Sequence, residues 1–242
     1  MRTLVIGIPL PSATFDNYSF ASAPSFAEFS QIIVDMESVS KVVDEIAIGV
    51  SDHKNFLGHP ITNTPTSSTT FALADLLEMR SREAGWSLTH GSVIVCLAQP
   101  DVAHNAISGV DGWRRYSWLP SPEGFRYAEH LLPGYGTPGA ILTANDHAFA
   151  PYVQTFGDRL AYRAVIDENS PGFADFGSVF IRSHAGAPIG AELKVQKGSV
   201  IILPPPLRFE SERALLAQTL SDCLDRHSKE ASDAPFPLTE GA

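Results

Sequence analysis

The stretch Thr69–Pro100, TTFALADLLEMRSREAGWSLTHGSVIVCLAQP, decides the fold. In its first half, Phe71, Leu76 and Leu77 recur at helical spacing, which predicts an amphipathic helix. Its second half contains the uninterrupted apolar run Val93–Leu97. A strand without polar alternation is buried on both faces, as in the middle of a parallel sheet. The stretch therefore predicts a helix that leads into a central strand.

Polar residues and glycine define the expected ends of this helix. The hydroxyls of Ser67–Thr69 can accept hydrogen bonds from the first free amides, so the helix is expected to begin there. Gly85 is the expected end, because glycine adopts the left-handed conformation readily. Glu78 precedes Arg82 by one helical turn, which favours a surface ion pair.

Composition and charge exclude several classes of protein. The 242 residues carry a net charge of −10 and no Lys/Arg cluster, which disfavours binding to nucleic acid or to an anionic membrane surface. No stretch approaches the roughly 20 apolar residues of a membrane helix. The two cysteines do not form a disulfide framework. We therefore expect a cytoplasmic protein that binds neither nucleic acid nor a membrane.

The remaining chain continues the pattern of strands and helices. Residues 1–229 are expected to form a single α/β domain, and residues 230–242 a disordered tail, since that segment has two prolines and no apolar stripe. Lys197-Gly198 is expected to form a two-residue hairpin turn. The expected strands are Leu4–Ile8, Phe29–Asp35, Ile141–Thr143, Leu160–Asp167, Ser178–Ser183, Ala191–Gln196 and Ser199–Leu203, and the final helix is Arg208–Lys229.

An aromatic segment, Phe15–Phe26, follows the first strand and is expected to be a loop. Asp16, Asn17 and Tyr18 would lie at the strand ends, where α/β proteins bind ligands. The segment contains no glycine and cannot cradle a phosphate as a nucleotide-binding loop does. Its aromatic residues either pack the loop against the domain or bind a ligand or partner.

The region 98–139 is long and lacks clear periodicity, and long loops of this kind are often functional. Its aromatic and basic residues either form a flap, with the Trp rings in the core and the Arg side chains outward, or form an anion-binding or interface patch. Gln99, at the open end of the central strand, is expected to lie nearby. The residues concerned are Trp113, Arg114, Arg115, Tyr116 and Trp118.

The order of elements resembles the class I glutamine amidotransferase-like superfamily. The resemblance rests on a helix and glycine turn before the strand GSVIVCL (91–97), and on the later hairpin GAELKVQKGSVIILPPP (190–206). It covers most of the chain. It implies an α/β fold of flavodoxin-like character: a three-layer sandwich with a mostly parallel central sheet and a C-terminal antiparallel hairpin.

The segment around Cys96 is similar to part of the nucleophile motif of the active family, Gly-x-Cys-x-Gly, but differs at its glycines. Ile94 and Ala98 stand where the two glycines belong, and the sharp nucleophile turn requires minimal side chains there. None of His104, His130, His147, His184 and His227 is followed two residues later by Glu, as the family's His-x-Glu motif requires. The resemblance is therefore to a branch that lacks the amidotransferase triad.

Two functions remain open from the sequence. The first is a non-catalytic binding or assembly module that acts with a protein partner or as a homo-oligomer. The second is a hydrolase or transferase with an unconventional site at the strand ends, built from Asp16, Asn17, Cys96 and Gln99. No metal, nucleotide or other cofactor motif is present, so we expect neither a metal nor a cofactor.

Overall fold

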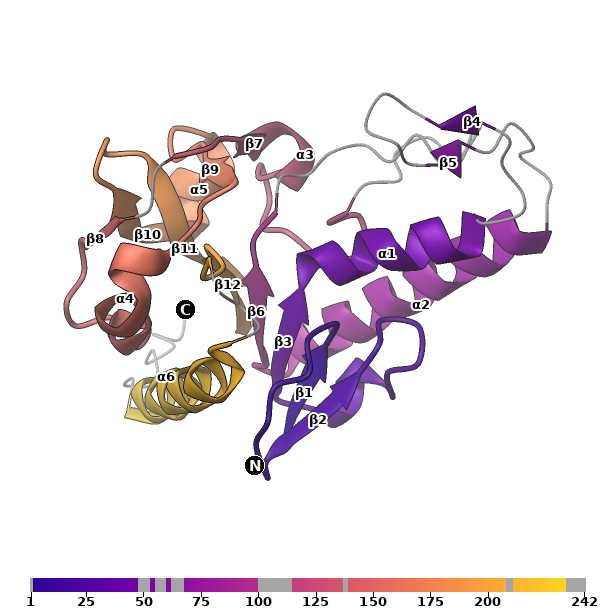
Figure 1. Cartoon of the computed structure of the whole chain (residues 1–242), viewed down its shortest axis with the longest axis horizontal. Helices are drawn as coiled ribbons and strands as arrows, with labels where there is room; N and C mark the ends of the chain where they lie inside the picture. The colour runs from indigo at the N-terminus through magenta and orange to yellow at the C-terminus, as the bar shows by residue number, and fades with distance from the viewer. Residues whose placement is uncertain are drawn as a thin grey trace, which may run out of the picture.

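A computed structural model describes residues 2–47, 53–54, 60–61, 68–99, 115–136, 139–207 and 211–233. Eight strands form one sheet in the order β2-β1-β3-β6-β12-β11-β10-β8 (Figure 1). The first five of these run parallel to one another, and the last three are added antiparallel. The strands are β1 (Thr3–Ile6), β2 (Phe15–Tyr18), β3 (Gln31–Asp35), β6 (Val93–Leu97), β8 (Ala140–Leu142), β10 (Gly177–Ser183), β11 (Pro188–Val195) and β12 (Gly198–Leu203).

The predicted central strand is confirmed. β6 lies between β3 and β12 and is parallel to both. All five of its residues are buried, because alternate side chains enter two different hydrophobic clusters. Ile94 and Cys96 belong to one cluster, and Val93, Val95 and Leu97 belong to the other. An apolar core on both faces explains why the strand carries no polar alternation.

The two clusters are completed by helices on different sides of the sheet. Met36 and Val39 of α1 and Leu77 of α2 belong to the cluster of Ile94, whereas Tyr152 of α4 and Leu220 of α6 belong to the other. Figure 1 shows α1 and α2 on one side of the sheet and α4 and α6 on the other. The helices are α1 (Met36–Ala47), α2 (Ser68–Thr89), α3 (Tyr127–His130), α4 (Ala150–Phe156), α5 (Pro171–Phe176) and α6 (Arg213–Asp233), with 3-10 turns η1 (Phe26–Glu28) and η2 (Gly157–Arg159).

Two short sheets complete the described structure. Each consists of one antiparallel pair, and neither belongs to the main sheet. The first lies between α1 and α2 in the chain, and the second brings the strand that follows α3 against a strand that follows α4. They are β4 (His53–Lys54) with β5 (Pro60–Ile61), and β7 (Leu131–Pro133) with β9 (Ala164–Ile166).

The predicted end of α2 at Gly85 is wrong, because the helix continues to Thr89. Ser87 and Leu88 are buried, and their burial offsets the cost of about 1 kcal/mol for an interior glycine. The chain turns instead at Gly91, whose φ of +85° lies in the left-handed region. The predicted ion pair between Glu78 and Arg82 is confirmed.

Three other expected boundaries are corrected. The segment Phe15–Tyr18 is the edge strand β2 and not part of a loop. The hairpin turn consists of Gln196 and Lys197, because Val195 pairs with Gly198. The final helix is shifted toward the C-terminus and ends at Asp233, so the first residues of the predicted tail are helical, whereas residues 234–242 lie outside the described part of the chain.

Candidate functional site

A pocket of about 210 Å³ lies at the carboxyl ends of β3, β6 and β12. We call it the carboxyl-end pocket. Asp35 ends β3, Gln99 follows β6, and Pro205 and Pro206 follow β12, so three neighbouring parallel strands deliver its walls. The lining residues are Asp35, Glu37, Gln99, Ala161, Arg163, Pro205, Pro206 and Leu207.

The topology explains why the sheet opens here. After β3 the chain enters α1, which packs with one hydrophobic cluster, and after β12 it enters α6, which packs with the other. The two exits therefore diverge to opposite sides of the sheet. In open α/β sheets such a divergence leaves a crevice outside the carboxyl ends of the strands, where ligands bind.

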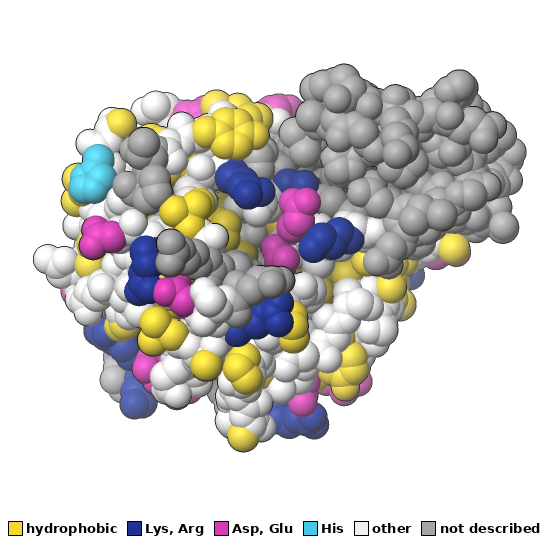
Figure 2. Space-filling model, viewed as in Figure 1, with side chains coloured by type: hydrophobic (Ala, Val, Ile, Leu, Met, Phe, Trp, Pro, Cys, Tyr) yellow, Lys and Arg dark blue, Asp and Glu magenta, His cyan; other side chains and the backbone are white. Residues whose placement is uncertain are grey.

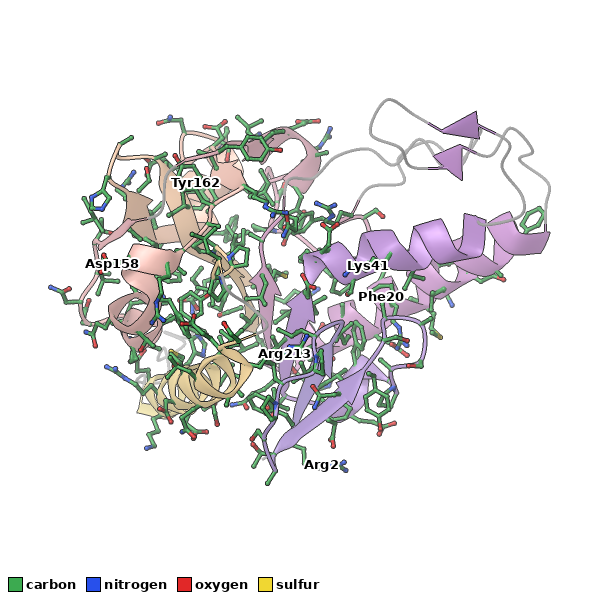
Figure 3. The ribbon with its side chains drawn as sticks, in the orientation of Figure 1. Arg2, Phe20, Lys41, Asp158, Tyr162 and Arg213 are labelled. Carbon is green, nitrogen blue, oxygen red and sulfur yellow. The ribbon has the colours of Figure 1, made fainter. Side chains whose placement is uncertain are left out.

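Asp35 joins the sheet to the first turn of α1. Its Oδ1 accepts a hydrogen bond from the amide of Glu37 at 3.1 Å, as an N-cap residue does, and its carbonyl accepts one from Ser38 Oγ at 2.6 Å. Burial raises the pKa of the Asp35 carboxyl, and the Glu37 amide, Lys41 and Arg115 oppose this shift only in part. Figure 3 labels Lys41 on α1. A carboxyl with a raised pKa in a pocket is typical of a functional group.

Tyr116 fixes the chain where it leaves β6. Its hydroxyl donates to the carbonyl of Gln99 at 2.8 Å and accepts from the Gln99 amide at 3.2 Å. The Gln99 side chain is then directed to Arg163, whose Nη1 lies 3.4 Å from Oε1. The buried Tyr116 ring also stacks on Tyr127, with the ring centres 5.0 Å apart. These contacts hold a side-chain amide and a guanidinium at the pocket wall.

A second arginine, Arg115, pairs with a lining residue of the pocket. Arg115 is buried, and its Nη2 lies 3.3 Å from Oε2 of Glu37. The pocket therefore combines two carboxylates, one amide and the guanidinium of Arg163, and one of the carboxylates, Glu37, is paired with Arg115. Figure 2 shows basic and acidic side chains close together on one face of the molecule, without a field of one sign.

Asp16, Asn17 and Tyr18 do not line the carboxyl-end pocket. Asp16 forms an ion pair with Arg2 at 2.6 Å, and the Asn17 side chain bonds both the amide and the carbonyl of Leu10. Tyr18 is partly exposed on the edge strand. Asp16 lies on β2, and β1 and β3 lie between β2 and β6. Three inter-strand spacings therefore separate β2 from β6, which amounts to roughly 14 Å. The structure therefore does not bring these residues to Gln99.

The aromatic and basic residues at 113–118 match neither alternative from the sequence in full. Trp118 is fully buried, and its ring meets Phe20 and Phe26 edge to face, with centroids 5.3 and 5.7 Å away. Of the two Trp rings that the flap alternative places in the core, Trp118 is buried there, and Tyr116 is buried as well. Arg115 does not point outward, as that alternative expected, because it pairs with Glu37. Trp113 and Arg114 lie outside the described residues.

Cys96 is not positioned as a nucleophile. Its side chain is fully buried in the middle of the sheet, and this burial raises the pKa of the thiol. Thiol chemistry requires the thiolate, so both access and ionisation oppose a catalytic role. Burial likewise raises the pKa of the Cys223 thiol to about 12.

The three charged residues of the pocket, Asp35, Glu37 and Arg163, are not among the candidate residues from the sequence. The sequence does indicate a place for Asp35 at the pocket, because Asp35 ends one predicted strand and Gln99 follows another. Placing both strand ends on the same edge of a parallel sheet would have paired them. Arg163 gave no such indication: the sequence places it inside the expected strand Leu160–Asp167, whereas it lies in the irregular segment before β9, which spans only Ala164–Ile166.

A second group of charged side chains surrounds Glu192 on β11. His147 Nε2 donates to Oε2 at 3.1 Å, whereas His227 Nε2 and Ser199 Oγ donate to Oε1 at 3.0 and 2.6 Å. Lys194 also bonds Oε1. We call these five residues the Glu192 cluster. Burial opposes ionisation of Glu192, but the four donors outweigh it and lower the pKa of the carboxyl.

The described residues contain no group of three or more His, Cys, Asp or Glu side chains arranged to hold a metal ion. In the Glu192 cluster, both imidazoles direct Nε2 at the same carboxylate. In the part of the chain that the structure describes, no helix is both long and apolar enough to cross a membrane.

Comparison with known proteins gives little beyond this geometry. No family model and no curated protein matches the chain. The solved structure of the cytoplasmic protein STM1381 from Salmonella typhimurium LT2 is similar, with a TM-score of 0.48 and 13% identity over 94% of this chain and 99% of that one. The cytoplasmic protein STM3548 from Salmonella typhimurium gives 0.40 and 11% over 93% and 98%. At these scores neither likeness carries an inference about function.

Proposed function

We propose that this chain is a non-catalytic binding module on an amidotransferase-like, three-layer α/β scaffold, and that its ligand binds in the carboxyl-end pocket. The observation that carries the proposal is the convergence of Asp35, Gln99 and Arg163 at the ends of neighbouring parallel strands. The buried thiol of Cys96 argues against thiol catalysis by this residue.

The lining predicts the chemistry of the ligand. Arg163 offers planar donors that suit a carboxylate or a similar anionic group. Asp35 and Glu37 accept hydrogen bonds and suit an ammonium or amide group. A volume of about 210 Å³ is below the usual range for drug-sized ligands, so the ligand is small. We infer a small polar molecule that carries both kinds of group.

Arg115, Tyr116 and Trp118 do not support the predicted protein partner, because their side chains are buried. The partner therefore remains a prediction from the sequence. The small-molecule part of the proposal stands without it.

A thermal-shift screen of small zwitterions and dicarboxylates tests the proposal. A ligand that binds only the folded state raises the melting temperature. We expect the stabilising compounds to lose their effect on R163Q and to keep it on R126Q, because Arg126 forms an exposed pair with Glu129 away from the pocket. An equal effect on wild type and R163Q would exclude this pocket as the site.

A second candidate is an acid–base hydrolase or transferase at the same pocket, with Asp35 in place of Asp16, Asn17 and Cys96. The raised pKa of the Asp35 carboxyl favours it, because general acids and bases work best near the ambient pH. NMR of each stabilising compound after incubation with the protein distinguishes the two functions. Conversion that D35N stops, while binding persists, would establish the enzyme; unchanged compounds support the module.

A further inference from the structure

The outer side of α2 presents a stripe of exposed residues that includes large apolar side chains. At 3.6 residues per turn, the stripe falls within a sector of about 100° on the helix. The buried residues Leu77, Ala84 and Leu88 lie on the opposite side of the helix, against the core. We call the exposed stripe the α2 face. Its residues are Phe71, Asp75, Glu78, Met79, Arg82 and Trp86.

The apolar residues of the α2 face are open to solvent. Phe71 and Trp86 are each 58% exposed, and Met79 is 42% exposed. The apolar pattern of the sequence groups Phe71 with Leu76 and Leu77, whereas the structure buries Leu77 and exposes Phe71. Figure 1 shows α2 beside α1, with both helices extending beyond the sheet. Exposed apolar side chains that gather on one stripe mark a surface for another protein.

The order of charges along the α2 face makes it complementary to a second copy of itself. Asp75 lies in the first half of the face, and Arg82 lies in the second half. In an antiparallel pair of α2 helices whose two-fold axis passes between Glu78 and Met79, residues equally far from the axis face each other. Asp75 of one copy then faces Arg82 of the other copy, and this contact between opposite charges occurs twice.

The same arrangement joins the aromatic ends of the α2 face. Phe71 and Trp86 are equally far from the axis, so the phenyl ring of one copy meets the indole ring of the other. Burial of these rings supplies hydrophobic stabilisation, and aromatic residues dominate contacts of this kind. A parallel pair would instead place Arg82 against Arg82 and Asp75 against Asp75, and like charges in contact are destabilising. The charges therefore favour the antiparallel pair.

Arg82 has donors for a contact within its own helix and for a second one across the pair. Its Nη2 pairs with Glu78 of the same helix, and 75% of its side chain remains exposed. A guanidinium carries five N–H donors, so it can bind a second carboxylate beside the first. Glu78 therefore holds the guanidinium on the α2 face, where Asp75 of a second copy is able to reach it.

We propose that this protein forms a homodimer in which the α2 faces of two copies pack antiparallel, with Asp75 opposite Arg82 and Phe71 opposite Trp86. The contacting segment is about 23 Å long at 1.5 Å per residue. A single helix pair of this length lies at the small end of specific interfaces, so the dimer is weak and depends on protein concentration. The α2 face contributes no residue to the carboxyl-end pocket, so the dimer is a property beyond ligand binding there.

Sedimentation velocity of the full chain over a range of concentrations tests the dimer. The wild type should change from monomer to dimer as the concentration rises. D75R and R82E should each weaken self-association by about tenfold or more, because each places like charges opposite each other at both contacts. R126E is the matched control for R82E, since Arg126 also forms an exposed ion pair with a nearby glutamate but lies outside the α2 face. It should leave self-association unchanged.

A mixture of the two charge-reversal variants tests the antiparallel arrangement itself. When D75R and R82E are combined, every facing pair consists of one acidic and one basic side chain. We therefore expect heterodimers in the mixture, although each variant alone stays largely monomeric. The double variant D75R/R82E should dimerise by itself for the same reason. Both positions are exposed, so circular dichroism should show that the variants fold like the wild type.

W86A tests the aromatic contact. It removes the indole ring from the α2 face and should weaken self-association by about tenfold or more, because a buried Trp often carries much of the binding free energy of an interface. Y135A is the matched control, since Tyr135 is an aromatic residue that is 76% exposed and lies outside the α2 face. It should leave self-association unchanged.

Several results would overturn the proposal. A wild type that stays monomeric up to about 1 mM would exclude the dimer and leave the α2 face to a different partner. A dimer that D75R and R82E leave intact, or equal losses in W86A and Y135A, would place the interface elsewhere. A mixture of D75R and R82E without heterodimers would exclude the antiparallel arrangement. None of these results bears on the ligand of the carboxyl-end pocket, because no residue of the α2 face lines it.

Discussion

Asp35, which is partly buried, and Glu192, which is buried, are two carboxyl groups whose pKa values shift in opposite directions. The pKa of Asp35 is raised by burial, whereas that of Glu192 is lowered despite burial. The difference follows from the donors around each group. Glu192 receives hydrogen bonds from four side chains, and Asp35 receives one from a backbone amide among the described residues. Burial alone therefore does not determine the charge state of a carboxyl group.

The same comparison indicates that Glu192 has a structural role, whereas Asp35 is a candidate functional residue. The oxygens of Glu192 are occupied by donors of the protein itself, so the Glu192 cluster stabilises the fold at the junction of β11, β12 and α6. Asp35 faces a pocket with acceptor capacity left over, which a ligand can use. Three substitutions test this distinction, because they should change stability by different amounts and in opposite directions.

The largest effect is expected for E192Q. It leaves Lys194 and two histidines facing a neutral side chain, and breaking a buried charged group of this kind costs about 3 kcal/mol. Denaturant unfolding of wild type and E192Q at pH 7 measures this loss in the free energy of unfolding. The control E129Q removes an exposed pair with Arg126 and should cost less than about 0.5 kcal/mol.

The stabilisation by Glu192 should also depend on pH. The folded-state pKa lies below the ordinary value of 4.5, so the contribution is fully present above that value and is lost as the pH falls below it. Wild type and E192Q should therefore converge in stability in acid. A constant difference between pH 7 and pH 3 would show that shape, and not charge, makes Glu192 important.

A smaller loss is expected for S199A, which deletes one of the four donors. A hydrogen bond to a charged group contributes about 1.5 kcal/mol, and the Ser199 Oγ–Glu192 bond is 2.6 Å long. The double variant S199A/E192Q should lose less than the sum of the single losses, because S199A removes the hydrogen bond whose charge E192Q has already removed. Strict additivity in denaturant unfolding would show that the two residues act independently.

The smallest effect, and the one of opposite sign, is expected for D35N. Asparagine keeps the N-cap acceptor for the Glu37 amide and removes the cost of a buried charge, so the variant should be more stable by about 0.5–1 kcal/mol at pH 7. The folded-state pKa lies above the ordinary 3.8, so the gain should vanish below pH 3.8, where the aspartic acid is neutral in both states. Destabilisation at pH 7 would show that the ionised Asp35 is a structural group.

The sequence predicts the central elements of this fold because their signals are local and strong. The apolar run of β6 and the stripe of α2 identify a central strand and its helix, and the hairpin of β11 and β12 follows from two close apolar runs. The end of α2 is harder to predict, because burial of Leu88 overrides the preference of Gly85. The edge strand β2 was missed, because half of its residues are polar and its pairing is with β1.

The candidate site is less predictable, because it depends on long-range contacts. Gln99 was found from its place at the end of β6, but Arg163 reaches it from a segment that is distant in the chain. Asp16 and Cys96 are residue types that often act in catalysis. Here Asp16 forms an ion pair with Arg2, and Cys96 is buried in the interior of the sheet. Residue type indicates what a side chain is able to do, and only its neighbours show whether it is free to do it.

The two edges of the main sheet bear on how copies of this chain could associate. β2 and β8 are only four and three residues long, and the β2 edge carries the Asp16–Arg2 ion pair. Short strands and charged side chains at an edge discourage the addition of a further strand. A homo-oligomer of this protein would therefore form through side-chain contacts on helices or loops, and its sheets would remain separate.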